Sequence, residues 1–103
     1  MMKLVKNTIP KKSPIHRYEA WTIMFYVYIL RSVNHPDQTY IGYSSDLKQR
    51  LQYHNSGKCK HTSKFIPWHI EFYCAFKIKS KALDFEKYLK SHSGKAFTNK
   101  RLI

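Results

Sequence analysis

The clearest pattern of apolar and polar positions lies between Ile70 and Ile78, where the two kinds alternate along the chain. The apolar side chains that share one face are Ile70, Phe72, Cys74, Phe76 and Ile78. Glu71, Tyr73 and Lys77 fall on the other face. Because successive side chains of a strand point to opposite sides, this alternation is typical of a strand with one buried face.

Two further strands are predicted nearer the N-terminus. Residues 25–30 are all aromatic, β-branched or leucine, a composition that favours a strand. Their side chains fall on two faces, with Phe25, Val27 and Ile29 on one and Tyr26, Tyr28 and Leu30 on the other. The turn cluster 34–37 separates them from a second short strand, 39–43, so we expect an antiparallel hairpin.

A first helix is predicted after this hairpin. Ser44 or Ser45 is expected to cap it, with Asp46 in its first turn. Gly57 is expected to end it. The face that recurs at helical spacing consists of Leu47, Leu51 and His54.

A second helix is predicted after residue 78, with Ser80 as its cap and Gly94 as its end. Its apolar stripe consists of Ala82, Phe85 and Leu89. Residues 95–103 are expected to add a short C-terminal helix. The element order β-β-α-β-α predicts an α+β fold, in which a small, mixed, three-stranded β-sheet is flanked by helices.

The length of 103 residues fits one domain. Residues 1–22 contain two prolines and scattered basic side chains without a sustained period, so we expect an extended or disordered basic arm before a folded domain at 23–103. No apolar run approaches the roughly 20 residues that cross a bilayer, and no apolar leader is visible. Two cysteines make a poor disulfide framework, so a cytoplasmic location is expected.

The charge narrows the choice of partners. Nineteen Lys and Arg residues oppose six Asp and Glu residues, which gives a net charge of +13. Such an excess attracts polyanions, nucleic acid first. An anionic membrane surface is a weaker candidate because the chain lacks a sustained basic amphipathic helix.

Several side chains combine into a candidate site. Glu86 falls inside the apolar stripe of the second helix. A carboxylate there is costly unless it is paired or binds a metal. The alternative is that Glu86 lies at the rim of the stripe and pairs with a nearby lysine. Arg50 and His54 lie one helical turn apart and are suited to gripping a phosphate and relaying a proton. The hairpin could bring the hydroxyls of Tyr28 and Tyr40 near Arg50. An ordinary tyrosine pKa of about 10 would have to be lowered by a cation before Tyr28 could act as a base.

The loop after the first helix adds a histidine and several lysines. Cys59, His61, His69 and Cys74 have irregular spacing, which is not typical of a zinc site. His61 is better suited to a phosphate contact or to the edge of the active site. The side chains predicted to contact nucleic acid are Lys48, Lys58, Lys60, His61, Lys64, Lys87 and Lys100.

The order of these motifs resembles the GIY-YIG endonuclease domain. The resemblance rests on Tyr26-Val27-Tyr28, Tyr40-Ile41-Gly42, Arg50-x-x-x-His54-Asn55 and Glu86. Thr62-Ser63-Lys64, Pro67-Trp68 and residues 87–90 are similar to small stand-alone members related to the N-terminal nuclease domain found in excinuclease ABC. The first motif has Tyr-Val-Tyr where the family has Gly-Ile-Tyr, and it keeps the final tyrosine.

The resemblance implies a metal-dependent endonuclease that hydrolyses phosphodiester bonds in DNA, in repair or processing. One Mg²⁺ or Mn²⁺ ion would be held by Glu86, Arg50 would neutralise the scissile phosphate, and Tyr28 would act as base or orient the water. Tyr40 and His54 would assist, and Asn99 would match an asparagine that some members place near the site.

Two alternatives stay open: a non-catalytic nucleic-acid-binding module of the same fold, and RNA as the substrate. We recognise no second DNA-binding domain in the sequence, so the choice of target stays open. A protein partner could recruit the nuclease to its target. The oligomeric state also stays open.

Overall fold

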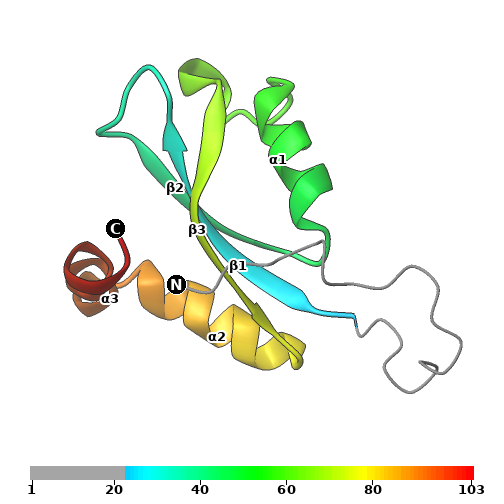
Figure 1. Ribbon diagram of the computed structural model, residues 1–103, viewed down its shortest axis with the longest axis vertical. Coiled ribbons are helices and arrows are strands. Elements are labelled where there is room, and N and C mark those ends of the chain that lie inside the picture. The colour runs from blue at the N-terminus through cyan, green and yellow to red at the C-terminus, as the bar shows by residue number, and fades with distance from the viewer. Residues whose placement is uncertain (1–22) are drawn as a thin grey trace, which may run out of the picture.

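A three-stranded antiparallel sheet forms the centre of the protein. The computed structural model describes residues 23–103, so the predicted arm at 1–22 lies outside the described residues. The strands are β1 (Phe25–Ser32), β2 (Thr39–Ser44) and β3 (Trp68–Phe76), in the spatial order β2-β1-β3 (Figure 1). The three-stranded α+β fold is confirmed, but the expectation of a mixed sheet was wrong. Strands β2 and β3 lie on opposite sides of β1, and each pairs with it antiparallel.

Helices pack on both faces of this sheet (Figure 1). Helix α1 (Leu47–Asn55) contributes Leu47 and Leu51 to a cluster around Tyr28, Leu30 and Trp68. On the other face, helix α2 (Lys79–Leu89) packs in a second cluster, whose buried members are Val27, Ile29, Ala82 and Leu89. The two predicted faces of the first strand are therefore confirmed.

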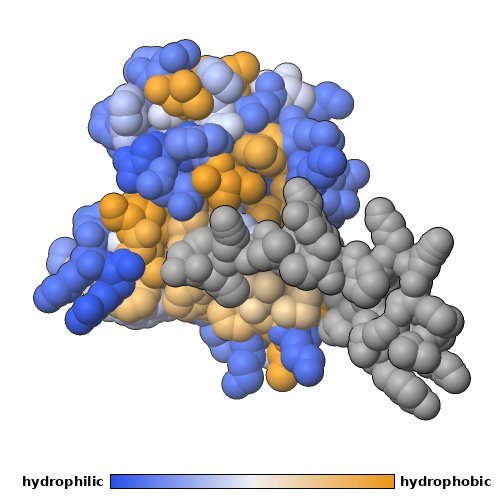
Figure 2. All heavy atoms as spheres, viewed as in Figure 1, coloured by the Kyte–Doolittle hydropathy of each residue, from blue (hydrophilic) through white to orange (hydrophobic). Residues whose placement is uncertain are grey.

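The C-terminal residues form two short helical segments beside α2. These are α3 (His92–Phe97) and a π-helical turn (Thr98–Leu102), which confirms the predicted C-terminal helix. A 3₁₀ turn (Ser63–Phe65) lies between α1 and β3. Hydrophilic side chains gather around α1 and around α3, with apolar side chains between them (Figure 2). Within residues 23–103, no helix has the length and apolar character needed to cross a bilayer.

A bulge in β3 changes the face of one predicted core residue. Ile29 pairs with Phe72 whereas the next residue, Leu30, pairs with Ile70, so Glu71 is the extra residue. Ile70 therefore packs with Leu30, on the face opposite to Phe72, Cys74 and Phe76. Strand β3 also ends at Phe76, and Ile78 is the half-exposed residue before α2. The single-face interpretation of residues 70–78 was wrong at both ends.

The first helix has a different N-terminal cap from the one predicted. Asp46, not Ser44 or Ser45, caps α1, since its carboxylate accepts a 3.0 Å hydrogen bond from the backbone N–H of Gln49. Ser44 fixes the turn before it, because its hydroxyl donates to the backbone oxygen of Asp46 and accepts from its N–H. Gly57, with φ 83°, follows the end of α1 as expected.

Helix α2 is shorter than predicted. It starts after Ile78 without a side-chain cap, so Ser80 lies inside the first turn, and it ends at Leu89. Ser91 then caps α3 by accepting from the N–H of Gly94. Gly94 lies in α3, where a Cβ would overlap the backbone oxygen of Tyr88. The glycine therefore allows two helices to approach closely and does not end α2.

This close approach predicts that Gly94→Ala destabilises the protein. The added methyl group forces α3 away from α2, and we expect the free energy of unfolding to fall by about 1–3 kcal/mol in urea denaturation. The control is the exposed neighbour Ser93, whose change to alanine should have little effect. Equal stability of the Gly94 variant and the wild type would contradict the close packing of α3 on the end of α2.

Candidate active site

The five predicted catalytic side chains meet at the β2 edge of the sheet. Tyr28, Tyr40, Arg50, His54 and Glu86 all line one cavity of about 330 Å³. The other lining residues are Gly42, Tyr43, Tyr53 and Cys59. Strand β2 is an edge strand, so side chains from the helices on both faces can reach the same cavity around it. The sequence predicted the members of this cluster, and their catalytic roles stay predictions.

A buried chain of hydrogen bonds crosses the floor of this cavity. The Tyr28 hydroxyl lies 3.0 Å from Nε2 of His54, and Nδ1 of His54 lies 3.0 Å from the Thr62 hydroxyl. All three side chains are at most 2% exposed. The Thr62 hydroxyl is also placed to donate to the backbone oxygen of Cys59 at 3.5 Å. This arrangement fits a neutral imidazole that accepts from Tyr28 at Nε2 and donates from Nδ1 to Thr62.

The electrostatics favour the same protonation states. Burial, followed by the positive charge of Arg50, lowers the pKa of His54, so the ring is neutral at neutral pH. Burial raises the pKa of Tyr28 far above its ordinary value, the neighbouring Tyr40 adds to this rise, and Arg50 only partly opposes it. Burial is also the main cause of the raised pKa of Tyr40. Both phenols therefore stay protonated, and Arg50 alone does not make Tyr28 a base.

The glycine of the Tyr40-Ile41-Gly42 motif leaves room for the Tyr28 ring. Tyr28 and Gly42 are direct cross-strand partners in the β1–β2 ladder. A Cβ on Gly42 would overlap the hydroxyl oxygen and the adjoining ring carbon of Tyr28. Only glycine lets the phenol lie across β2 and reach His54.

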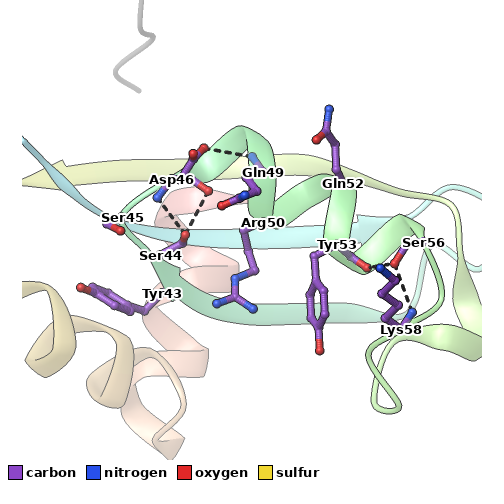
Figure 3. Close-up of a pocket in the computed structure, with 10 residues that line it drawn as sticks. All are labelled: Tyr43, Ser44, Ser45, Asp46, Gln49, Arg50, Gln52, Tyr53, Ser56 and Lys58. Carbon is purple, nitrogen blue, oxygen red and sulfur yellow. Dashed lines mark hydrogen bonds between the residues drawn. The ribbon is translucent and has the colours of Figure 1, made fainter.

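Arg50 is available for an anionic ligand. Its guanidinium lies 5.1 Å from the centre of the Tyr53 ring, a cation–π contact that holds it at the cavity. In the close-up, Arg50 points to the same side of α1 as Tyr53 (Figure 3). Among the ion pairs formed by residues 23–103, none includes Arg50. An arginine without a carboxylate partner can grip a phosphate through two parallel hydrogen bonds.

Glu86 is the carboxylate of the cavity and has a cation beside it. Its Oε2 lies 3.1 Å from Nζ of Lys90, one turn further along α2, and its side chain is 20% exposed. This is the lysine pair that the sequence left open as an alternative to a metal site. Within the described residues, no cluster of three His, Cys, Asp or Glu side chains could hold a metal ion. A one-carboxylate site fits Mg²⁺, which usually keeps several waters and binds one or two carboxylates together with substrate phosphates.

Several residues that line the cavity or contact its side chains were not predicted from the sequence. Lys90 could have been found from its position four residues after Glu86. Thr62 and Cys59 come from a loop without periodicity, so no pattern connected them to His54. Burial alone would raise the pKa of the Cys59 thiol. Hydrogen bonds from the Thr62 side chain and from the backbone outweigh this effect, so the pKa of Cys59 is lowered. Tyr53 had no feature that separated it from the other tyrosines.

The predicted nucleic-acid contacts are all exposed, but not all of them border the cavity. They are Lys48, Lys58, Lys60, His61, Lys64, Lys87 and Lys100. Lys58 lines a larger cavity along α1 together with Arg50, whereas Lys48 lies on an apolar hollow on the other side of that helix. Asn99 lines a neighbouring cavity together with Tyr40 and Lys90, and is thus next to the site. His61 is exposed and does not line the active-site cavity.

Comparison with known proteins agrees with this architecture. Residues 24–101 match the model of the GIY-YIG catalytic domain. UPF0213 protein SpyM3_1077 of Streptococcus pyogenes serotype M3 is 40% identical over 67 residues, which cover 63% of this chain and 70% of that protein. UPF0213 protein SpyM50708 of Streptococcus pyogenes serotype M5 is 39% identical over the same shares.

A solved structure is also similar to this chain. The solution NMR structure of UPF0213 protein BH0048 from Bacillus halodurans is 29% identical and covers 77% of this chain and 86% of its own, with a TM-score of 0.47. The family match places this small domain, with its sheet-edge cavity, in a nuclease family. The chain belongs to the GIY-YIG family, since the family model spans nearly all of the described residues.

The contact between Gly42 and Tyr28 predicts a strong coupling between these two positions. Gly42→Ala should lower the free energy of unfolding by about 1–3 kcal/mol, because the methyl group displaces the phenol. In a Tyr28→Ala background the methyl group finds free space, so the same change should cost much less. A double-mutant cycle in urea measures this difference, and additive costs would show that the ring does not lie across Gly42.

The lowered pKa of His54 predicts a pH dependence of stability. As the pH falls below the ordinary value of 6.5, the unfolded chain takes up a proton at this position before the folded protein does. The stability that neutral His54 contributes is therefore fully present above about pH 6.5. It is lost as the pH falls through the lowered pKa of the folded protein. Urea unfolding between pH 8 and pH 5 should show this loss, and His54→Gln should reduce it. The control is His61→Gln, a change at an exposed histidine, which should keep the wild-type dependence of stability on pH. An unchanged pH dependence in His54→Gln would refute the lowered pKa of His54.

Proposed function

We propose that this protein is a metal-dependent endonuclease that hydrolyses phosphodiester bonds in DNA. One observation carries the proposal: a carboxylate, an arginine with no acidic partner among residues 23–103 and a hydrogen-bonded tyrosine–histidine pair line a single cavity. The net charge of +13 supplies sequence-independent affinity for the phosphate backbone. Such an activity would serve DNA repair or processing, and the two free thiols support a cytoplasmic setting.

Each charged side chain has a distinct part in the proposed reaction. Glu86 would hold one Mg²⁺ ion, or Mn²⁺ in its place, together with water and phosphate oxygens. The bound ion supplies charge stabilisation on the phosphate and makes a coordinated water more acidic. Arg50 binds a non-bridging oxygen of the scissile phosphate and stabilises the charge that develops there. Tyr40 borders both this cavity and the neighbouring one and would assist Tyr28.

The tyrosine–histidine pair would handle the proton of the attacking water. The water oxygen forms a bond to phosphorus while the bond to the leaving oxygen breaks. The water proton passes to the Tyr28 oxygen as the Tyr28 proton passes to Nε2 of His54. The Thr62 hydroxyl keeps the ring oriented through Nδ1, and the leaving oxygen takes a proton from solvent. In this scheme His54 is the proton acceptor and Tyr28 the relay, which agrees with the high pKa of the phenol.

The decisive variant is Glu86→Ala, with Asp84→Ala as its matched control. Asp84 is an exposed carboxylate on the same helix and outside the cavity. We expect Glu86→Ala to lower Mg²⁺-dependent cleavage of supercoiled plasmid and of branched and single-stranded oligonucleotides by at least about 100-fold. Binding measured in chelator should be unchanged or tighter, because removing a carboxylate removes repulsion of the phosphate. Asp84→Ala should cleave like the wild type.

The same assay separates the alternatives. Binding without cleavage by the wild type on every substrate would favour a non-catalytic nucleic-acid-binding module. Faster cleavage of RNA than of DNA of the same sequence would reassign the substrate. Equal loss of binding and cleavage in Glu86→Ala would contradict its role as a metal ligand.

A further inference from the structure

A second cavity, of about 620 Å³, lies along α1 and adjoins the active site. Its volume is within the range of about 300–1,000 Å³ that is usual for small-molecule sites. It shares Tyr43, Arg50 and Tyr53 with the active-site cavity, so the two lie side by side. Figure 3 shows these three side chains on the same side of α1. A group bound along α1 would therefore lie directly beside a phosphate bound by Arg50.

Tyr53 gives this cavity an exposed aromatic surface. Its side chain is 37% exposed although it is a large ring next to the catalytic groups. One contact comes from the guanidinium of Arg50, 5.1 Å from the ring centre, and another from the edge of His54, at 5.6 Å between ring centres. These neighbours fix the ring, and its 37% exposure leaves part of it open to solvent. A fixed, partly exposed aromatic ring is the kind of surface on which single-stranded nucleic acids stack their bases.

Most other residues that line the cavity are polar, and two of its residues, Arg50 and Lys58, are cationic against one carboxylate. Lys58 follows the end of α1 and is exposed, and Gln49 and Gln52 supply side-chain amides that can donate to and accept from a base edge. The one carboxylate, Asp46, is already used as the cap of α1. This set of groups suits a nucleotide, with a flat base on the ring and a phosphate near the cations.

We propose that this cavity holds the unstacked base of a nucleotide next to the scissile phosphate, with Tyr53 as its stacking surface. The proposal rests on the proposed nuclease function and narrows its substrate class. In an intact duplex both faces of a base are covered by its neighbours, so the ring of Tyr53 can be used only where a strand is unpaired or distorted. The preferred substrates are then single strands, flaps or branched junctions.

The test measures affinity by fluorescence anisotropy in chelator, so that no cleavage occurs. Labelled single-stranded DNA is compared with a series in which one nucleotide at a time is abasic. Stacking of one base is worth about 1–3 kcal/mol, so Tyr53→Ala should weaken binding of the single strand by about 5- to 150-fold. Tyr53→Phe keeps the ring and should bind like the wild type. Binding of intact duplex should change little.

A cycle between protein and DNA gives the sharper result. For the wild type, one abasic position beside the cleaved bond should weaken binding, and in Tyr53→Ala the same abasic position should cost nothing further. Tyr53→Leu keeps an apolar side chain next to His54. Weak binding by this variant as well would show that the lost affinity comes from the missing ring and not from lost packing. Tyr88, 40% exposed on α2 and outside both cavities, is the matched control, and Tyr88→Ala should keep wild-type affinity.

The outcomes separate the two proposals. If the wild type cleaves DNA but Tyr53→Ala binds every oligonucleotide as tightly as the wild type, the stacking site is wrong and the nuclease proposal stands. The stacking site is also wrong if each abasic position costs the same in both proteins. If the wild type neither binds nor cleaves nucleic acid, both proposals fail.

Discussion

The hydrogen-bond chain from Tyr28 through His54 to Thr62 is the interaction on which the site depends. It joins the central strand, the first helix and the loop that follows it, and all three groups are removed from water. A buried polar group without a partner costs about 1–3 kcal/mol, so each member is stable only while the other two are in place. The Tyr28 phenol is therefore held by the same contacts that hold the fold.

The loop between α1 and β3 is fixed by a second set of bonds around the same residues. The indole N–H of Trp68 donates to the backbone oxygen of Thr62. Asn55, at the end of α1, uses both ends of its amide on the backbone of Trp68. Asn55 belongs to the Arg50-x-x-x-His54-Asn55 motif, and these bonds give it a structural part: it fastens the end of the helix to the start of β3.

Sequence patterns predicted the element types and a set of side chains that line one cavity, because both follow local spacing. Composition located the first two strands and alternation the third. The helical spacing of Arg50 with His54 and of Glu86 with its stripe put these side chains near the sheet. The family resemblance then joined them into one site. The errors came from long-range effects. The bulge at Glu71 moved Ile70 to the other face, and the approach of α3 to α2, not a helix end, explains Gly94. The prediction of a mixed sheet was wrong because β3 pairs with β1 and not with β2, beside which it would have been parallel.

The Glu86–Lys90 ion pair has a consequence for how the site is charged. The carboxylate that the proposal assigns to a divalent ion already has an ammonium group 3.1 Å away. The charge on Glu86 is thus balanced from within the chain, and folding needs no bound ion, in contrast to small domains that are unfolded without their metal. A divalent ion at Glu86 would compete with Lys90 for the carboxylate. Lys90 also lines the neighbouring cavity and, once released, would be free to meet a phosphate there. Binding of the ion to Glu86 would then release Lys90 to bind the substrate phosphate.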